Sequence, residues 1–459
     1  MCWNVKYVIL LLLSTIITYL SGLVLGFVKR KKYEESKRNK YQICCVAICF
    51  ILNLSILFFF KYSAFALKNI SYLLNLVHVE LNIPEFDIML PVGISFYTFQ
   101  ALSYTMDVYR DEIYLEKNFF KYALFVSFFP QLVAGPIERS KNLLKQLSLP
   151  QRFDFGRARS GFLLMLWGFF LKLVIADRIA IFVDMVYMHY DIYRGYYIIV
   201  ATMLFAIQIY CDFYGYSSIA MGAAEILGIR LMENFNSPYL SQSMSEFWRR
   251  WHVSLNSWFR DYLYIPIGGS KKGKIRKYIN TMIVFAASGL WHGAEWTFVI
   301  WGGINGICQV AGEILKPVRD RLVKILRLNR NSWGHKAVCI VSTFIIIDIT
   351  WFFFRVENIS GAKEMIKALL AENNMWIFFD GSLYECGLDS KNFWLMIYSC
   401  IVVLFADIQK YKGICVREFI IRQDYWLRWV IIAFGVWFVV VFGVWGSGYD
   451  ASKFIYFQF

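Results

Sequence analysis

Apolar runs separated by short basic loops form the dominant pattern along this chain. A helix needs roughly 20 apolar residues to cross a membrane, and most of the runs approach that length. The pattern therefore predicts an all-α, polytopic membrane protein with roughly ten to twelve transmembrane helices, some of them re-entrant or interfacial. The segment 62–79 is ambiguous, because it is apolar but contains Lys68, Asn69 and Asn75. The expected spans lie near residues 5–28, 42–60, 88–106, 119–135, 160–176, 196–211, 213–229, 279–291, 296–314, 337–354, 393–407 and 427–446.

Composition supports this class. Of the 459 residues, 58% are hydrophobic and 18% are charged, whereas soluble proteins average about 45–50% and about 25%. The net charge of +15 does not indicate a nucleic-acid partner, because Lys and Arg gather in short loops between apolar runs, as residues that set membrane topology do. The expected partner is a lipid bilayer, and no nucleic acid.

The ends and loops of the chain predict its organisation. The first apolar run, 5–28, is too long for the hydrophobic region of a signal peptide, and no small-residue cleavage site follows it. The basic run Lys29–Lys32 should lie in the cytoplasm, which puts the N-terminus outside. We expect one membrane domain over 1–459, with its motifs in about 88–315. The ten cysteines show no metal-ligand spacing, so neither disulfides nor a metal site is expected.

His292 is the leading candidate for a functional residue. It lies between two basic clusters, 271–277 and 316–324, and both should be cytoplasmic. The chain must therefore enter and leave the membrane between them, which barely accommodates two spans of about 20 residues. The turn around His292 should lie at depth, where an ionisable side chain indicates function. Gly289 and Gly293 should leave room for a substrate beside the imidazole.

A second candidate lies in the segment 245–264. Aromatic residues recur there at spacings of three and four, with arginines beside them, which is typical of an amphipathic helix at a membrane surface. Ser245 is the expected N-cap, and the basic cluster 271–277 puts this helix at the cytoplasmic face. His252 fits catalysis and headgroup binding equally well. The arginines suit either the binding of a phosphate-bearing substrate that donates a group in a reaction or anchoring to lipid headgroups. They are Arg249, Arg250 and Arg260.

Polar residues also interrupt the apolar run at 208–217. Gln208 and Asp212 belong to this cluster. It predicts a broken helix that lines a cavity and contacts substrate, and the alternative is helix packing through polar contacts.

The sequence lacks the motifs of several other chemistries. It has no G-x-S-x-G, P-loop, HExxH or GxGxxG motif, which disfavours Ser/His/Asp hydrolysis, ATP-driven transport, metalloproteolysis and dinucleotide redox chemistry. A histidine can instead take a proton from an alcohol as the alcohol attacks a carbonyl, with no metal and no bound cofactor.

Four segments resemble the motifs of the membrane-bound O-acyltransferase (MBOAT) family. They resemble most closely its bacterial branch, which includes alginate O-acetyltransferases and the D-alanyl transferases of teichoic acid. The segments are 90–100 (LPVGISFYTFQ), 246–252 (EFWRRWH), 260–269 (RDYLYIPIGG) and 289–293 (GLWHG). Trp296–Phe298 and the C-terminal Phe457–Phe459 look more like the alginate-acetylating members.

The resemblance implies a fold, an activity and roles for several residues. The fold would be a ring of tilted helices around a thinned centre, in the plasma (inner) membrane of a bacterium. His292 matches the catalytic histidine of the family and His252 its second motif histidine, with Trp291 among the substrate-binding residues. The donor would be a cytoplasmic thioester, either acetyl-coenzyme A or an acyl carrier protein. The acceptor would be an extracytoplasmic polysaccharide, reached through an SGNH-type acyltransferase partner.

Two other functions remain open at this point. The first is D-alanyl transfer to teichoic acid, within the same family. The second is non-enzymatic transport of a glycan or an ion, since charges at depth and a broken helix suit a transporter too. Inverted repeats are absent from the sequence, although many transporters have them, and this favours the O-acyltransferase.

Overall fold

A computed structural model describes residues 6–79, 91–445 and Phe454. Every regular element in these residues is a helix, which confirms the all-α prediction. The chain divides into two compact units. Unit 1 comprises residues 1–154 and 227–232, and unit 2 comprises residues 155–226 and 233–459.

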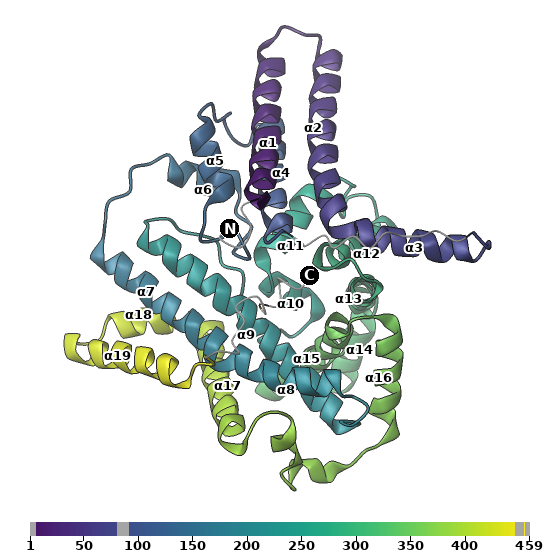
Figure 1. Ribbon diagram of the computed structural model, residues 1–459, viewed down its shortest axis with the longest axis vertical. Coiled ribbons are helices and arrows are strands. Elements are labelled where there is room, and N and C mark those ends of the chain that lie inside the picture. The colour runs from purple at the N-terminus through teal and green to yellow at the C-terminus, as the bar shows by residue number, and fades with distance from the viewer. Residues whose placement is uncertain (1–5, 80–90, 446–453, 455–459) are drawn as a thin grey trace. The chain divides into compact units, whose positions relative to one another are not determined.

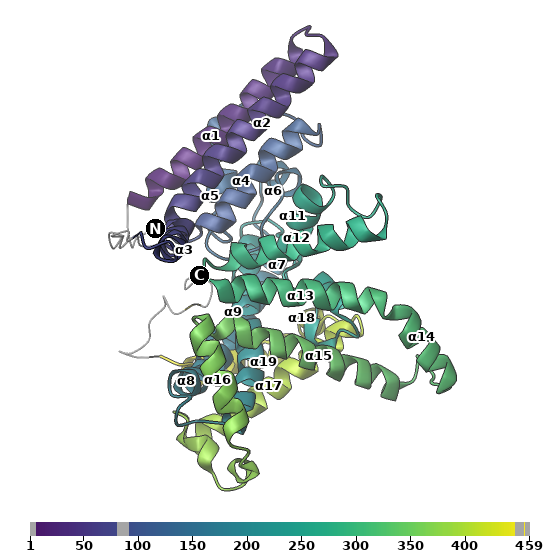
Figure 2. The same ribbon diagram turned by 90° about the vertical axis from the view of Figure 1, so that its right-hand side faces the viewer.

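Unit 1 is built around three helices, α1, α2 and α4, which lie side by side (Figure 2). Polar side chains join them inside apolar surroundings, where each polar group needs a partner. Ser14 donates to Asn53 over 2.6 Å, and the hydroxyls of Ser21 and Thr105 lie 2.8 Å apart. The helices of this unit are α1 (Lys6–Arg30), α2 (Glu35–Leu57), the π-helix η1 (Phe58–Tyr62), α3 (Ser63–Asn75), α4 (Ile94–Tyr109), α5 (Phe119–Ser127) and α6 (Ser140–Leu147).

Unit 2 contains the remaining helices. They are α7 (Phe155–Phe169), the π-helix η2 (Phe170–Ala176), α8 (Asp177–Met188), α9 (Tyr196–Ile226), η3 (Pro238–Leu240), α10 (Met244–Arg250), α11 (Val253–Phe259), the π-helix η4 (Arg260–Tyr264), α12 (Lys274–His292), α13 (Trp296–Ile314), α14 (Lys316–Ile325), α15 (Trp333–Arg355), α16 (Ile359–Ala371), η5 (Met375–Phe378), η6 (Ser382–Glu385), α17 (Ser390–Tyr411), α18 (Val416–Ile421) and α19 (Tyr425–Phe442).

Helices α7 and α9 form the closest helix pair of unit 2 and lie side by side in Figure 1. Glycines line their contact. A Cβ atom at Gly161 would lie 2.5 Å from the carbonyl oxygen of Gly222, and one at Gly168 would lie 2.6 Å from that of Gly215. Small residues allow helices in a membrane to pack backbone against backbone, so these four glycines set the separation of the two helices.

A second glycine contact joins α12 and α13, which lie side by side with α15 next to α13 (Figure 2). A Cβ atom at Gly289 would lie 2.3 Å from the carbonyl oxygen of Phe298, and one at Gly302 would lie 2.4 Å from that of Phe285. The two helices therefore form a tight hairpin. This confirms the pair of adjoining helices predicted on either side of His292.

The number of spans differs from the prediction. Six helices of the described residues are long and apolar enough to cross a membrane, or seven if the bent pair α13–α14 is counted. One reason is that the runs 196–211 and 213–229 fold as a single helix, α9. Another is that several expected spans end early, such as 119–135, where α5 has nine residues. A multi-pass membrane protein is nevertheless confirmed.

Two glycines of the α12–α13 hairpin provide a matched test of its packing. Gly289→Ala should lower the unfolding temperature of the purified protein, because its Cβ would meet the Phe298 carbonyl. Gly303→Ala should leave it unchanged or raise it, since nothing lies within 4 Å of a Cβ there and alanine stabilises a helix by roughly 0.5–1 kcal/mol relative to glycine. Equal effects of the two substitutions would contradict this packing.

Candidate active site

His292 is the last residue of α12, and only 5% of it is exposed. The chain then turns through Gly293–Glu295 into α13. Aromatic rings surround the imidazole: the ring centroids of Trp291, Trp301 and Phe354 lie 5.0, 5.1 and 5.3 Å from its own. α12, α13 and α15 thus each contribute to the environment of His292.

The glycines beside His292 do not have the role predicted from the sequence. A Cβ atom at Gly293 would lie 2.1 Å from the ring of Phe298, and Gly289 faces the backbone of the same residue. The volume beside both glycines is therefore filled by α13, not left open for a substrate. Their lack of side chains brings α13 close to α12 and so fixes the end of α12, where His292 lies.

His252 lies at a break between two short helices. Its backbone has φ 43° and ψ 54°, in the left-handed region, which separates α10 from α11. The single amphipathic helix predicted over 245–264 is therefore wrong. The N-cap is Ser243, whose side chain accepts a hydrogen bond from the backbone N–H of Glu246, and not Ser245. A left-handed residue other than glycine or asparagine costs roughly 1–2 kcal/mol, so surrounding contacts must hold it.

The aromatic residues of this segment are buried within the protein. Trp248, Trp251 and Trp258 are all buried, and the ring of Trp251 lies 5.0 Å from that of Trp351 on α15. The prediction of a helix lying flat at a membrane surface is therefore wrong for this face. The spacing of three and four correctly indicated that one side of the segment is covered by apolar groups. It could not distinguish a covering of lipid from one of neighbouring helices.

The structure brings the two predicted histidines together. The ring centroids of His252 and His292 are 6.5 Å apart, and Trp291 lies 5.9 Å from His252. His252 is 1% exposed and lies outside the helices that qualify as membrane spans. Its burial lowers the pKa of the imidazole to about 3, because desolvation penalises the charged form. His252 is therefore a neutral hydrogen-bonding group at physiological pH.

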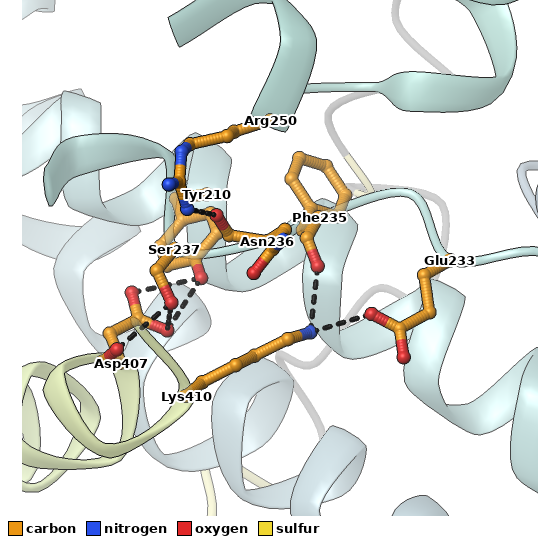
Figure 3. Close-up of polar contacts among 8 residues, drawn as sticks. All are labelled: Tyr210, Glu233, Phe235, Asn236, Ser237, Arg250, Asp407 and Lys410. Carbon is orange, nitrogen blue, oxygen red and sulfur yellow. Dashed lines mark hydrogen bonds and ion pairs between the residues drawn. The ribbon is translucent and has the colours of Figure 1, made fainter. Parts of the chain in front are cut away.

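The loop Glu233–Ser237, which is bonded to the turn containing His252, also forms hydrogen bonds with α17, as Figure 3 shows. Lys410 donates to the Glu233 carboxylate and to the Phe235 carbonyl, both over 2.8 Å. Asp407 accepts hydrogen bonds from the hydroxyl of Tyr210 at 3.0 Å, and its backbone carbonyl accepts from Ser237 at 2.9 Å. Sequence analysis missed this loop, because its residues carry no motif. The signal in the sequence was an Asp and a Lys three positions apart at the end of an apolar run.

The three candidate arginines have different surroundings. Arg250 is held in place: it pairs with Glu246 at 2.9 Å, donates to the carbonyl of Asn236 at 3.0 Å and lies 4.8 Å from the centre of the Tyr411 ring. Arg249 is exposed. Arg260 is also exposed and bonds to its neighbour Asp261. Arg249 and Arg260 are therefore accessible to a ligand, whereas Arg250 serves the structure of the turn.

The polar cluster on α9 also differs from the prediction. α9 is continuous from Tyr196 to Ile226, so the broken helix expected around Gln208 and Asp212 is wrong. Asp212 instead pairs at 2.7 Å with Lys172 of η2, which also pairs at 2.7 Å with Asp177. This favours the alternative of packing through polar contacts, since charges inside a membrane protein pair with one another.

Gln208 lies one helical turn before Asp212 on α9 and is buried. Its side-chain oxygen has no hydrogen-bond partner among the described residues. Among all the residues that the structure describes, no group of three or more His, Cys, Asp or Glu side chains is arranged to hold a metal ion.

The left-handed backbone at residue 252 leads to a stability prediction. His252→Asn should unfold at a higher temperature than His252→Ala, because asparagine tolerates this conformation; the expected difference is about 1 kcal/mol. Thermal unfolding of the purified protein measures it. Ser257, inside α11, is the matched control, since alanine should be the more stable substitution there. The same order at both positions would contradict the backbone argument.

Fold and site define a polytopic, all-helical membrane protein with a buried pair of histidines. Residues 43–354 match the model of the membrane-bound O-acyltransferase family, MBOAT. The chain belongs to this family and is an O-acyltransferase. The matched region includes both histidines and ends at the last turn of α15. The first residue of the motif at 90–100 lies outside the described residues. The whole of the C-terminal segment 457–459 also lies outside them.

Named relatives are similar over most of the chain. It is 32% identical over 409 residues to "Probable alginate O-acetylase AlgI" of Azotobacter vinelandii, an alignment that covers 89% of this chain and 77% of that protein. It is 32% identical over 403 residues to the peptidoglycan O-acetyltransferase of Helicobacter pylori, covering 81% and 72%. A teichoic acid D-alanyltransferase of Bacillus subtilis is 28% identical over 292 residues, covering 61% and 72%.

Proposed function

We propose that this O-acyltransferase moves an acetyl group from a cytoplasmic thioester donor across the membrane, for O-acylation of an extracytoplasmic polysaccharide. The observation that carries the proposal is the buried pair of His252 and His292, 6.5 Å apart. The 6.5 Å separates the centroids of the two rings. It leaves room for a single oxygen atom to form a hydrogen bond of about 2.8 Å to one nitrogen of each ring. The pair is thus suited to hold one acceptor hydroxyl.

In this proposal His292 acts as the general base. It takes the proton of the acceptor hydroxyl while the oxygen forms a bond to the thioester carbonyl carbon. The carbon–sulfur bond then breaks, and the thiolate takes the proton back from the imidazolium as it leaves. His252 remains neutral throughout and orients the hydroxyl by a hydrogen bond. Atoms and charges balance without a metal or a bound cofactor.

Acetyl is proposed as the acyl group on the names of the relatives. Relatives that align over 89% and 81% of this chain are called alginate O-acetylase and peptidoglycan O-acetyltransferase. The D-alanyltransferases align over less of it and at lower identity. D-alanyl transfer is therefore the second candidate, and mass spectrometry of the ester released from the polysaccharide distinguishes the two groups. The transporter alternative rested on charges at depth and on a broken helix, and it has lost the second of these, since α9 is continuous.

The donor and the partner follow from the location of the two substrates. A thioester such as acetyl-coenzyme A or an acyl carrier protein is made in the cytosol, while the polysaccharide lies outside the cell. We propose that the chain resides in the bacterial inner membrane and hands the acyl group to an extracytoplasmic SGNH-type acyltransferase. Exposed Arg249 and Arg260 are proposed to attract the anionic donor, because guanidinium groups bind phosphate in a bidentate manner.

The assignment of His292 as the base is tested by His292→Ala. The amount of alkali-released acetyl ester on the exported polysaccharide should fall about 10²–10⁴-fold, which is the usual contribution of positioned proton transfer. His189→Ala is the control, since that histidine is exposed. Acetylation near the wild-type level in a normally inserted His292→Ala protein would show the assignment to be wrong.

The role of Arg249 is tested in inverted membrane vesicles supplied with acetyl-coenzyme A. Arg249→Gln should raise the KM for donor severalfold and leave kcat within about twofold, since an exposed ion pair contributes up to about 1 kcal/mol to binding. Arg321→Gln removes another exposed arginine, on α14, and should change neither constant. An unchanged KM for Arg249→Gln, with less protein in the membrane, would instead indicate headgroup anchoring.

A further inference from the structure

Two short segments of unit 2 are bonded to each other beside the histidine pair. One is the loop Glu233–Ser237 and the other is the turn Arg250–Ser254, which contains His252. The backbone N–H of Asn236 donates to the carbonyl of Arg250 at 3.0 Å. The N–H of Val253 donates to the carbonyl of Asn234, also at 3.0 Å. The loop therefore contacts the turn on both sides of His252.

Asn234 makes the central contacts of this loop. It is fully buried. Its side-chain oxygen accepts from the backbone N–H of Ser254 at 3.3 Å, and its side-chain nitrogen donates to the Ser217 hydroxyl on α9 at 3.2 Å. The side chain is thus fixed at both ends, between α9 and the first turn of α11.

Asn234 replaces the cap that α11 lacks. His252 is the N-cap residue of α11, but its side chain makes no capping hydrogen bond. Helices need acceptors for their first N–H groups, and Asn234 supplies two: its backbone carbonyl for Val253 and its side-chain oxygen for Ser254. Asn234, from a different segment, thereby holds the two residues after His252.

The imidazole of His252 depends on this arrangement for its direction. Its ring lies 4.6 Å from that of Phe213 and 6.5 Å from that of His292, and its Nδ1 lies 3.5 Å from the Ser254 hydroxyl. A left-handed backbone points a side chain differently from a helical or extended one. If the turn relaxed out of this region, the imidazole would swing away from His292.

The far side of the loop is anchored by α17. Lys410 bonds to Glu233 and to the carbonyl of Phe235, and Asp407 bonds to Ser237 (Figure 3). Ser237 is itself left-handed, with φ 48°. The residues on both sides of Asn234 are therefore held in place, and Asn234 presents its backbone carbonyl and its side-chain oxygen toward the turn.

We propose that Asn234 is the positioning residue of His252: it holds the left-handed turn that directs the imidazole toward His292 during acyl transfer. The proposal rests on the proposed function, since it needs His252 to take part in the reaction. It assigns a role in catalysis to a residue that touches neither reacting group. Displacement of a reacting group by about 1 Å can cost about 10²-fold in rate, so Asn234 should affect kcat far more than KM.

Two substitutions of similar size separate the hydrogen bonds of Asn234 from its volume. Asn234→Leu fills the space but removes the acceptor for Ser254. Asn234→Asp keeps that acceptor, and the Ser217 hydroxyl can donate to the new carboxylate. Transfer of labelled acetyl from acetyl-coenzyme A to the polysaccharide is measured in inverted vesicles from cells that make the full chain, its SGNH-type partner and the polysaccharide. Asn234→Leu should lower kcat at least about tenfold with the KM for donor within about twofold, and Asn234→Asp should restore kcat to within about threefold of wild type.

Asn53→Leu is the matched control. Asn53 is also a buried asparagine, bonded to Ser14 in unit 1, and it makes none of the hydrogen bonds that hold the turn at His252. Its loss should lower the unfolding temperature as Asn234→Leu does, but leave kcat unchanged. If Asn234→Leu does not fold, Ser217→Ala provides the test, because it removes one anchor of the Asn234 side chain and should lower kcat severalfold.

Several outcomes would overturn the proposal. These are a wild-type kcat in Asn234→Leu, an Asn234→Asp protein as slow as Asn234→Leu, or a wild-type kcat in Ser217→Ala where that variant carries the test. Failure of the proposed function gives a different result, since wild type and His292→Ala would then both transfer no acetyl.

Discussion

The close approach of α12 and α13 is the constraint on which the candidate active site depends. Gly289 and Gly302 allow the two backbones to meet, and this contact fixes the end of α12, where His292 lies. It also brings Trp301 of α13 within 5.1 Å of the imidazole ring. Small residues are the usual means of tight helix packing in a membrane, where no hydrophobic effect drives helices together. The position of His292 is therefore set by packing and not by a flexible loop.

Ion pairs in unit 2 join segments that are distant in sequence. Lys172 on η2 bonds to Asp177 and to Asp212 on α9, and Lys410 on α17 bonds to Glu233. Asp212 is buried, and a buried charge is costly unless it is paired, so this pair holds η2 against α9. The Lys410 pair matters most for the site, because the loop that it holds is bonded to the turn containing His252. Polar residues of α17 are thus connected to the turn at His252 through the hydrogen bonds of the loop Glu233–Ser237.

Sequence patterns predicted the class of protein, and they selected the two histidines that the structure brings together. Hydropathy reports which segments avoid water, so the all-helical membrane fold followed from it. The motif around His292 lies between two basic clusters, which limit the chain length available for spans and predict a helical hairpin. The same reasoning failed for the segment 245–264 and for Gly289, since apolar and small residues look alike whether they face lipid, substrate or another helix.

The sequence by itself therefore determined the helical membrane class, the hairpin at His292 and the residue types available for acyl transfer. Only the tertiary structure decided which of these residues meet. His252 and His292 are 40 positions apart, and their 6.5 Å separation depends on a left-handed residue and on the loop around Asn234. Asp407 and Lys410 lie still further along the chain. Such contacts join segments distant in sequence and carry no local periodicity, so no pattern along the chain reports them.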